Sequence, residues 1–259
     1  MQDVFWAPES NVNGMERATT PKRWTVSSEA GKAAGVPLAL FVALAASAWH
    51  IAKPTDLDQN IYDHIGANGN GVVFHIAKVI SYTASPLGGT LLVVAAAAFV
   101  WWKKRDVVAT LATVLAPGIA AVVQRVAKDL IKRPRPPFTA RLTAQSGYGF
   151  PSGHAAGIGA LVTVLSLLIL AKRISVKQPN VTITVLALFG VLVAFTRLLV
   201  GAHYFTDAAA GLALGSAIAC LVTATIPRLD RIYRRFARRS PDATRPADHP
   251  AVRSKQTMP

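Results

Sequence analysis

Six long apolar stretches constrain this sequence more than any other feature. Each approaches the length of about 20 residues that a helix needs to cross the hydrocarbon layer of a bilayer. A backbone surrounded by lipid must satisfy its own hydrogen bonds, which favours helices. The sequence therefore predicts an all-α, polytopic membrane protein with six transmembrane helices. The stretches are 33–52, 86–102, 107–126, 154–171, 181–200 and 208–226.

The composition supports a membrane location and argues against a nucleic acid partner. The 259 residues are 52% hydrophobic and 16% charged, with a mean hydropathy of +0.36. The formal net charge is +15, but much of it lies after Pro227, outside the apolar stretches. A basic segment beside a membrane helix is typical of the cytoplasmic face. The single cysteine, Cys220, excludes an intrachain disulfide.

The polar segments divide the chain into three regions. Residues 1–32 are polar and lack the apolar core and cleavage site of a signal peptide, which indicates a disordered cytoplasmic arm. Residues 33–227 are expected to form the six-helix membrane domain, and 228–259 a basic cytoplasmic tail. Between the first two stretches, apolar residues at helical spacing over 72–80 predict an amphipathic helix on the membrane surface.

Positive charge orients the predicted helices. Basic residues precede the first helix, join the second to the third and the fourth to the fifth, and follow the sixth. The positive-inside rule assigns these segments and both termini to the cytoplasm, and the 53–85 loop with its surface helix to the outer face. One outer loop breaks the rule, and binding an anion is the simplest reason. Its charges are Lys128, Lys132, Arg133, Arg135 and Arg141, with only Asp129 to balance them.

Two of these cations are predicted to bind phosphate. Lys128 and Arg135 are seven residues apart, so both can face one site even if the intervening prolines turn the chain. Arginine matches two phosphate oxygens with its planar fork, and lysine supplies a mobile point charge. We interpret Lys132, Arg133 and Arg141 instead as interface anchors beside phospholipid headgroups.

A predicted helix start offers a second place for an anion. Ser152 is a suitable N-cap, Gly153 lets the backbone approach a ligand, and the amides of a helix N-terminus attract negative charge. His154 then lies in the first turn, at the mouth of the site. Taken alone, this segment would be interpreted first as a capped helix start with an interfacial histidine, and only the third block favours the anion site.

The third block combines a cation with a histidine and a carboxylate. Arg197 lies near the outer end of an apolar helix, where an unpaired charge costs about 2 to 3 kcal/mol even on lenient insertion scales. A bound phosphate would be a suitable partner. His203 and Asp207 are spaced i, i+4, so on the sixth helix they would share a face. The carboxylate could then accept one imidazole proton and leave the other nitrogen as a nucleophile. The alternative is a pair that only secures a helix end.

Together the three blocks resemble the signature of the type 2 phosphatidic acid phosphatase superfamily, which includes bacterial lipid phosphatases, glucose-6-phosphatase and the vanadium haloperoxidases. The resemblance covers roughly residues 50–226. The blocks are Lys128 through Arg135-Pro136, Pro151-Ser152-Gly153-His154, and Arg197 with His203 and Asp207. The family usually has serine before the third-block arginine, where this chain has Thr196. Because the hydroxyl is retained, we expect little functional change.

The resemblance implies a role for each residue. His203 would attack phosphorus to form a phosphohistidine, and Asp207 would orient it. His154 would protonate the leaving group and then activate water. The phosphoryl oxygens would be held by Lys128, Arg135, Arg197, Ser152 and the Gly153 amide. Neither a metal nor another cofactor is expected, and residues 33–227 would be the phosphatase domain.

The predicted position of the site indicates the substrate class. A site at the outer ends of the helices lies at headgroup depth, so the expected partners are membrane lipids and a lipid phosphate: phosphatidic acid, phosphatidylglycerol phosphate, or a polyprenyl phosphate or diphosphate. The Ala, Arg and Val content suggests a bacterial plasma membrane and, as one alternative, a polyprenyl-phosphoribose phosphatase of wall synthesis. A vanadium haloperoxidase would share the anion pocket, but that group is soluble. A silent carrier would leave the His-Asp pair unexplained. No pattern predicts the oligomeric state.

Overall fold

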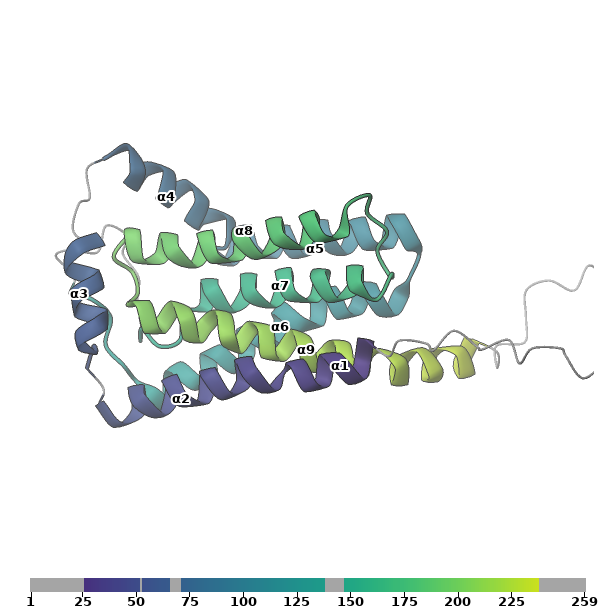
Figure 1. The fold of residues 1–259 in the computed structure, drawn as a ribbon, viewed down its shortest axis with the longest axis horizontal. Coiled ribbons are helices and arrows are strands. Elements are labelled where there is room, and N and C mark those ends of the chain that lie inside the picture. Colours follow the sequence, from purple (N-terminus) through teal and green to yellow (C-terminus); the bar gives the residue numbers. More distant parts are fainter. Residues whose placement is uncertain (1–25, 52, 66–70, 138–146, 238–259) are drawn as a thin grey trace, which may run out of the picture.

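The computed structural model describes residues 26–51, 53–65, 71–137 and 147–237, and within these ranges every regular element is a helix (Figure 1). The prediction of an all-α fold is confirmed. The helices are α1 (Val26–Ala33), α2 (Gly35–Ile51), α3 (Asp56–Ile65), α4 (Val72–Thr83), α5 (Pro86–Lys104), α6 (Val107–Ile131), α7 (Gly153–Leu170), α8 (Pro179–Leu199) and α9 (Phe205–Ala237).

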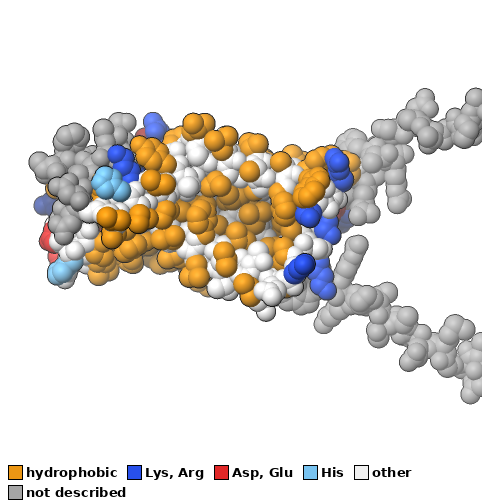
Figure 2. Space-filling model, turned by 90° about the horizontal axis from the view of Figure 1, so that it is seen from above, with side chains coloured by type: hydrophobic (Ala, Val, Ile, Leu, Met, Phe, Trp, Pro, Cys, Tyr) orange, Lys and Arg blue, Asp and Glu red, His pale blue; other side chains and the backbone are white. Residues whose placement is uncertain are grey.

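Six segments of the described chain are long and apolar enough to cross a membrane, as predicted. The first combines the end of α1 with α2, and the others are α5, α6, α7, α8 and most of α9. Apolar side chains cover the flank of the bundle between its two ends (Figure 2). The spans are Glu29–His50, Pro86–Lys104, Val107–Ile131, Gly153–Leu170, Pro179–Leu199 and Phe205–Tyr233.

The boundaries of the terminal regions differ from those predicted. α1 begins at Val26, inside the segment expected to be a disordered arm, because residues 26–33 continue into α2 and pack against α9. α9 continues past Pro227 to Ala237, so the first part of the expected tail is helical. The remainder of both arms, 1–25 and 238–259, lies outside the described residues.

α7 lies at the centre of the bundle and packs against α6, α8 and α9 (Figure 1). Glycines bring α9 very close to it. A Cβ atom at Gly215 would overlap the carbonyl oxygen of Ala156, and one at Gly211 would lie 2.5 Å from the carbonyl oxygen of Ser152. This contact therefore fixes the N-terminus of α7 against the first turns of α9.

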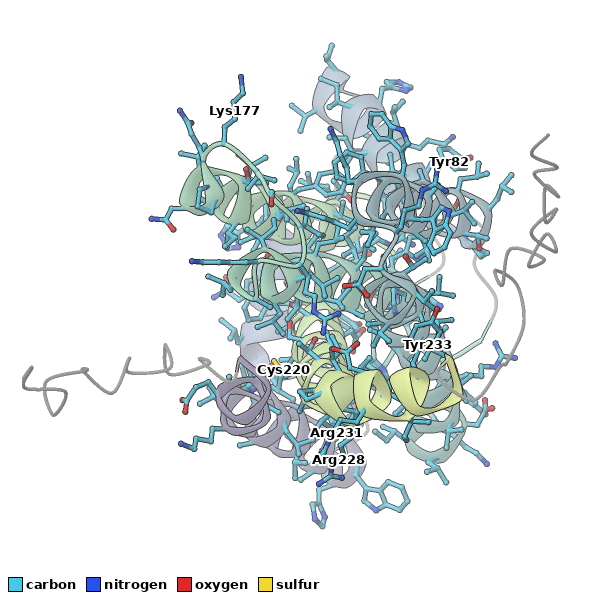
Figure 3. All side chains as sticks on the ribbon, turned by 90° about the vertical axis from the view of Figure 1, so that its right-hand side faces the viewer. Tyr82, Lys177, Cys220, Arg228, Arg231 and Tyr233 are labelled. Carbon is cyan, nitrogen blue, oxygen red and sulfur yellow. The ribbon has the colours of Figure 1, made fainter. Side chains whose placement is uncertain are left out.

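The connections between helices gather at the two ends of the bundle. α3 and α4 lie at one end, with the C-terminal ends of α6 and α8 and the N-terminal ends of α7 and α9 (Figure 1). The basic connections lie at the other end, where lysine and arginine side chains gather (Figure 2). Lys177, Arg228 and Arg231 are labelled at this end in Figure 3. Arg173 there forms ion pairs with Asp106, at 2.6 Å, and with Asp230. The connections thus separate as the charge pattern predicted.

The predicted amphipathic helix over 72–80 is present as α4. Its Phe74 and Ala77 are buried, and they pack with Val200 and Ala202 at the end of α8. Four of the apolar residues from which it was predicted lie on the opposite, exposed side: Val72, Val73, Ile76 and Val79. The fifth, Ile80, is partly buried and packs against the core beside α7 and α8. One face of α4 therefore covers the bundle, and the other presents apolar side chains to the surroundings.

Candidate active site

The N-terminus of α7 forms one wall of the site. Ser152 is the N-cap, as predicted, because its Oγ accepts a hydrogen bond from the amide of Ala155 at 3.5 Å. The amide of Ser152 itself donates to the carbonyl oxygen of Asp207 at 2.9 Å, which ties α7 to α9. Gly153 begins the helix and His154 follows in its first turn. The amides of this turn carry the partial positive charge that suits an anion.

α6 supplies Lys128 from its last turn. The side chain is 9% exposed, and its Nζ donates to the carbonyl oxygens of Tyr148 at 2.9 Å and Gly149 at 3.4 Å. The amide of Gly149 in turn donates to the carbonyl oxygen of Arg133 at 2.8 Å. The segment that leads into α7 is therefore held against the end of α6, and Lys128 is positioned by it.

Arg135 lies in the segment that follows α6 and contacts the predicted nucleophile. Its Nε donates to the carbonyl oxygen of Gly147 and its Nη1 to that of Ala202, both at 2.9 Å. The same Nη1 lies 3.2 Å from Nε2 of His203. Because a guanidinium has only donors, Nε2 must accept this hydrogen bond, and we assign the ring proton to Nδ1. The lone pair of His203 is then on Nε2, beside the guanidinium of Arg135.

The turn between α8 and α9 positions His203. Gly201 has a φ of +62°, in the left-handed region that favours glycine. Its amide donates to the carbonyl oxygen of Leu198, and the amide of Ala202 donates to that of Arg197. This pair of hydrogen bonds is the Schellman motif that ends a helix, and it places His203 two residues after Gly201.

The prediction that His203 lies on the sixth helix with Asp207 is wrong. α9 begins only at Phe205, with Tyr204 as its N-cap residue. Oδ2 of Asp207, at position N3, accepts a hydrogen bond from the amide of Tyr204 at 3.0 Å, as the N3 side chain of a capping box does. His203 therefore precedes the helix, and its Nδ1 lies 3.6 Å from the same Oδ2. Burial, and then the charge of Arg135, hold the pKa of His203 well below 6.5, so the ring is neutral near pH 7.

Arg197 is almost completely buried in the last turn of α8, at 2% exposure. Its Nη1 forms a hydrogen bond with Oγ of Ser81 on α4. Its Nε and Nη2 are buried and have no hydrogen-bond partner among the residues that the structure describes. Buried donors on a cation are costly unless an anion pairs with them. Arg197 thus has two nitrogens available for an anion.

The structure brings the three sequence blocks together in one site. Lys128, Arg135 and Arg197 all lie close enough to His203 for their charges to interact with its imidazole ring. The same three charges interact with the imidazole ring of His154. His154 in turn acts on His203, so the two histidines also lie within electrostatic range of one another. A tetrahedral anion between them would meet cations, amides of α7 and a neutral imidazole.

Arg133 was interpreted as an interface anchor, and that interpretation is wrong. The residue is 1% exposed. Its Nη2 donates to Oδ2 of Asp58 at 2.7 Å, and its Nη1 donates to Oδ1 of Asp207 at 2.8 Å and to Oγ1 of Thr206 at 2.6 Å. The guanidinium bridges two buried carboxylates and is not at the membrane interface, because these carboxylates require a cation.

Asp58 lies on α3, within the 53–85 segment that was predicted to be an outer loop. It is fully buried and accepts hydrogen bonds from the amide of Thr206 at 2.8 Å and from Arg133. Burial alone would raise the pKa of Asp58, but these hydrogen bonds hold it below its ordinary value. Asp58 therefore stays ionised, and it is a residue of the site region that no local sequence pattern indicates.

Three further residues were named from the sequence. Lys132 is exposed, as an interface anchor would be, and Arg141 lies outside the described residues. Oγ1 of Thr196 donates to the carbonyl oxygen of Val193 within α8, at 2.7 Å. The hydroxyl that replaces the usual serine is thus used inside its own helix.

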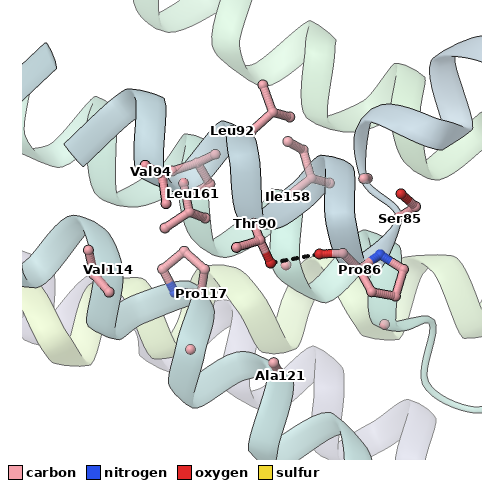
Figure 4. Close-up of a pocket in the computed structure, with 16 residues that line it drawn as sticks. Ser85, Pro86, Thr90, Leu92, Val94, Val114, Pro117, Ala121, Ile158 and Leu161 are labelled. Atoms are coloured by element: carbon pink, nitrogen blue, oxygen red, sulfur yellow. Dashed lines mark hydrogen bonds between the residues drawn. The ribbon is translucent and has the colours of Figure 1, made fainter. Parts of the chain in front are cut away.

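A cavity of about 340 Å³ lies beside the site, between α5, α6 and α7 (Figure 4). It begins at Gly153, at the start of α7, and continues along that helix past Gly157 to Leu161. The lining is almost entirely apolar. Val94 and Val114 line it and are also exposed on the flank of the bundle, so the cavity opens sideways. It adjoins the apolar surface of Figure 2 at one side and the anion site at the other.

Gln124 is a residue of this region that the sequence reasoning missed. It lies one turn before Lys128 on α6, and a Cβ atom on Gly153 would lie 3.1 Å from its Oε1. This oxygen is buried and has no hydrogen-bond partner in the described part of the chain. A single amide in an otherwise apolar stretch was the available signal.

Comparison with known proteins identifies a family and several similar proteins. The family model of the PAP2 superfamily matches residues 107–231, which contain all three blocks. Phosphatidylglycerophosphatase B of Bacillus subtilis (strain 168) is 28% identical over 127 residues, covering 48% of this chain and 62% of the relative. Decaprenylphosphoryl-5-phosphoribose phosphatase of Mycobacterium tuberculosis (strain ATCC 25618 / H37Rv) is 28% identical over 123 residues, covering 46% and 60%. The chain thus spans about three fifths of the length of these curated relatives.

A solved structure shares the fold. It is the crystal structure of a transmembrane PAP2 type phosphatidylglycerolphosphate phosphatase from Bacillus subtilis, with a TM-score of 0.62 and 24% sequence identity. The match covers 77% of this chain and 98% of that one. The arrangement of helices around the site is therefore shared over most of the bundle.

Proposed function

Because the chain belongs to the PAP2 superfamily, we propose that it is an integral membrane phosphatase that hydrolyses a phosphomonoester or diphosphate of a lipid. One observation carries the proposal. Arg197 is buried with two nitrogens directed to no partner in the described chain, beside Lys128 and the neutral His203. A phosphoryl group would satisfy these donors and meet a nucleophile at once.

The geometry supports a two-step mechanism. Nε2 of His203 attacks phosphorus, and the bond from phosphorus to the leaving oxygen breaks as His154 donates a proton to that oxygen. Asp207 faces the Nδ1 proton of the developing imidazolium and stabilises its charge. His154 then takes a proton from water, which attacks phosphorus. The phosphorus–nitrogen bond breaks, and inorganic phosphate leaves.

The cations stabilise the charge that develops during both steps. Lys128, Arg135 and Arg197, with the Gly153 amide and the Ser152 hydroxyl, would hold the three equatorial oxygens. Arg135 now donates to Nε2 of His203, so it would move from the nucleophile to the phosphoryl group when substrate binds. Cations gathered around the phosphoryl group in this way can replace a metal ion.

The lateral cavity supports a lipid as the substrate. It joins the N-terminus of α7 to the exposed apolar flank, and Gly153 lines it. A phosphate held at that N-terminus could therefore leave its hydrocarbon chain in the cavity and in the bilayer beyond. The same reasoning supports membrane lipids as the surroundings of the protein.

The topology is proposed from charge. The end with α3, α4 and the site would face outward from a bacterial plasma membrane, and the basic end would face the cytoplasm with both termini. The test uses His64→Cys on α3 and Lys177→Cys at the basic end, both exposed positions. An impermeant thiol reagent should label only the first in intact cells. Labelling of only the second would reverse the topology.

The activity is tested by phosphate release from phosphatidic acid in detergent micelles. We expect activity in the presence of EDTA, inhibition by vanadate, and loss of about a thousandfold or more in His203→Ala. His75→Ala on the exposed face of α4 is the matched control and should retain activity. Activity abolished by EDTA and restored by magnesium would contradict the metal-free mechanism, and an active His203→Ala would contradict the nucleophile.

The substrate head group is a second question. The two curated relatives are named for a phosphatidylglycerol phosphate and for a decaprenylphosphoryl-phosphoribose, so both remain candidates with polyprenyl diphosphate. Side-by-side kcat/KM values on these lipids and on phosphatidic acid would decide. A polyprenyl-phosphoribose phosphatase should prefer its own substrate by at least tenfold.

A further inference from the structure

A buried charged cluster lies directly behind the site. Arg133, after α6, bridges Asp58 on α3 and Asp207 on α9 at 2.7 and 2.8 Å. All three side chains are at most 1% exposed. Thr206 joins the cluster twice, because its amide donates to Oδ1 of Asp58 and its hydroxyl to Oδ2, both at 2.8 Å. The cluster therefore connects three segments that are far apart in the sequence.

Arg133 is placed to support Asp207 rather than to bind substrate. Its two terminal nitrogens are already used by Asp58, Asp207, the hydroxyl of Thr206 and the carbonyl oxygen of Lys53. The ring of Tyr204 encloses Arg133 further through a cation–π contact, with 5.3 Å between the guanidinium carbon and the ring centre. Its Nε is buried without a hydrogen-bond partner among the described residues, but a phosphoryl group could use the terminal nitrogens only by displacing a buried carboxylate.

The two oxygens of Asp207 have different partners. Oδ1 is held by Arg133 at 2.8 Å, while Oδ2 accepts from the amide of Tyr204 and faces Nδ1 of His203. Two separate donors thus fix the plane of the carboxylate. Without Arg133, Asp207 would be a buried charge without its cation, and it could rotate away from His203.

Asp58 completes the support from the other side. It binds the second nitrogen of Arg133, and it caps the start of α9 through the amide of Thr206. A carboxylate at a helix N-terminus also interacts favourably with the helix dipole. Asp58 therefore fixes both Arg133 and the helical turn that carries Asp207.

We propose that Arg133 and Asp58 are positioning residues for the reaction, which hold Asp207 in the orientation that His203 needs. The proposal rests on the proposed phosphatase function. It implies that their loss slows formation of the phosphohistidine and leaves the phosphate-binding cations intact. A misplacement of the nucleophile by about 1 Å can cost about a hundredfold in rate.

The test compares Arg133→Lys and Asp58→Asn with Arg125→Lys, an exposed arginine on α6 whose ion pair with Asp129 lies at the surface. Purified full-length proteins are assayed on phosphatidic acid, and inorganic phosphate binding is measured by calorimetry. We expect kcat to fall about a hundredfold in Arg133→Lys and about tenfold in Asp58→Asn. KM and the affinity for phosphate should stay within about twofold, and Arg125→Lys should match the wild type.

Two results would overturn the proposal. One is a folded Arg133→Lys and Asp58→Asn with wild-type kcat. The other is a raised KM and weakened phosphate binding at unchanged kcat, which would make Arg133 a direct ligand of the substrate. If Arg133→Lys fails to fold, Asp58→Asn decides alone. A wild type that binds phosphate but releases none from any lipid would contradict the proposed function instead.

Discussion

Nδ1 of His203 lies 3.6 Å from Oδ2 of Asp207, just beyond hydrogen-bond distance. The carboxylate is meanwhile hydrogen-bonded to Arg133 and to the amide of Tyr204. Catalytic hydrogen bonds are often long in the absence of substrate and shorten in the reacting complex. The carboxylate of Asp207 is therefore already fixed close to His203. A positive charge that develops on the imidazole ring would draw the ring toward this carboxylate.

The first prediction concerns the proton donor. His154→Ala should lower kcat on phosphatidic acid by about a hundredfold to ten-thousandfold, because the lipid alkoxide then leaves without a proton. A substrate whose leaving group needs no proton, such as p-nitrophenyl phosphate, should lose far less. The ratio of the two losses is the measurement. Equal losses on both substrates would exclude His154 as the acid for the leaving group.

The second prediction concerns pH. Burial and the charge of Arg135 lower the pKa of His203, so below about pH 6.5 the unfolded chain takes up a proton at this residue that the folded protein does not. The folded state should therefore lose up to about 1.4 kcal/mol of stability for each pH unit below 6.5. His203→Gln should remove this contribution.

The measurement is the melting temperature in detergent at pH 7.5 and at pH 5.5. The wild type should lose more on acidification than His203→Gln does, and His75→Gln, an exposed position, should behave as the wild type. An equal loss in wild type and His203→Gln would show that His203 is protonated in the folded protein at the lower pH.

Much of the architecture could be predicted because the deciding interactions are local. Apolar length alone indicates a membrane helix, and Ser152 before an apolar run is a recognisable N-cap. Gly201 carried a signal that was not used. A glycine after an apolar helix is typical of a helix end, and it would have placed His203 in a turn and not on α9.

The buried cluster could not be predicted, because its contacts are distant in sequence. Arg133 and Asp58 are separated by 75 residues, and a basic residue beside a membrane helix has the same local surroundings whether it contacts lipid or a carboxylate. Likewise nothing near Ser81 marks it as the partner of Arg197. Only the packing of α3 and α4 over the ends of the other helices brings these residues together.

The third prediction concerns the contact between α7 and α9. Gly215→Ala should destabilise the protein by about 1 to 3 kcal/mol, because the new methyl group would overlap the carbonyl oxygen of Ala156 and the helices would have to separate. Gly157→Ala is the matched control, since its Cβ would meet nothing within 4 Å. Thermal unfolding in detergent should show a loss only for Gly215→Ala. An unchanged melting temperature would contradict the close packing.

The fourth prediction concerns the lateral cavity and the lipid chain. Gly157→Leu would place a branched side chain into the cavity of about 340 Å³, where the Cβ position is open. If the cavity holds a hydrocarbon chain, KM for a long-chain phosphatidic acid should rise about tenfold, which is a typical cost of losing apolar contact in a pocket. A short-chain, soluble phosphate ester should be turned over as by the wild type, and Gly157→Ala should resemble the wild type on both. Equal kinetics of Gly157→Leu and wild type on the long-chain substrate would show that the chain binds elsewhere, whereas equal losses on both substrates would indicate a disturbed α7 N-terminus.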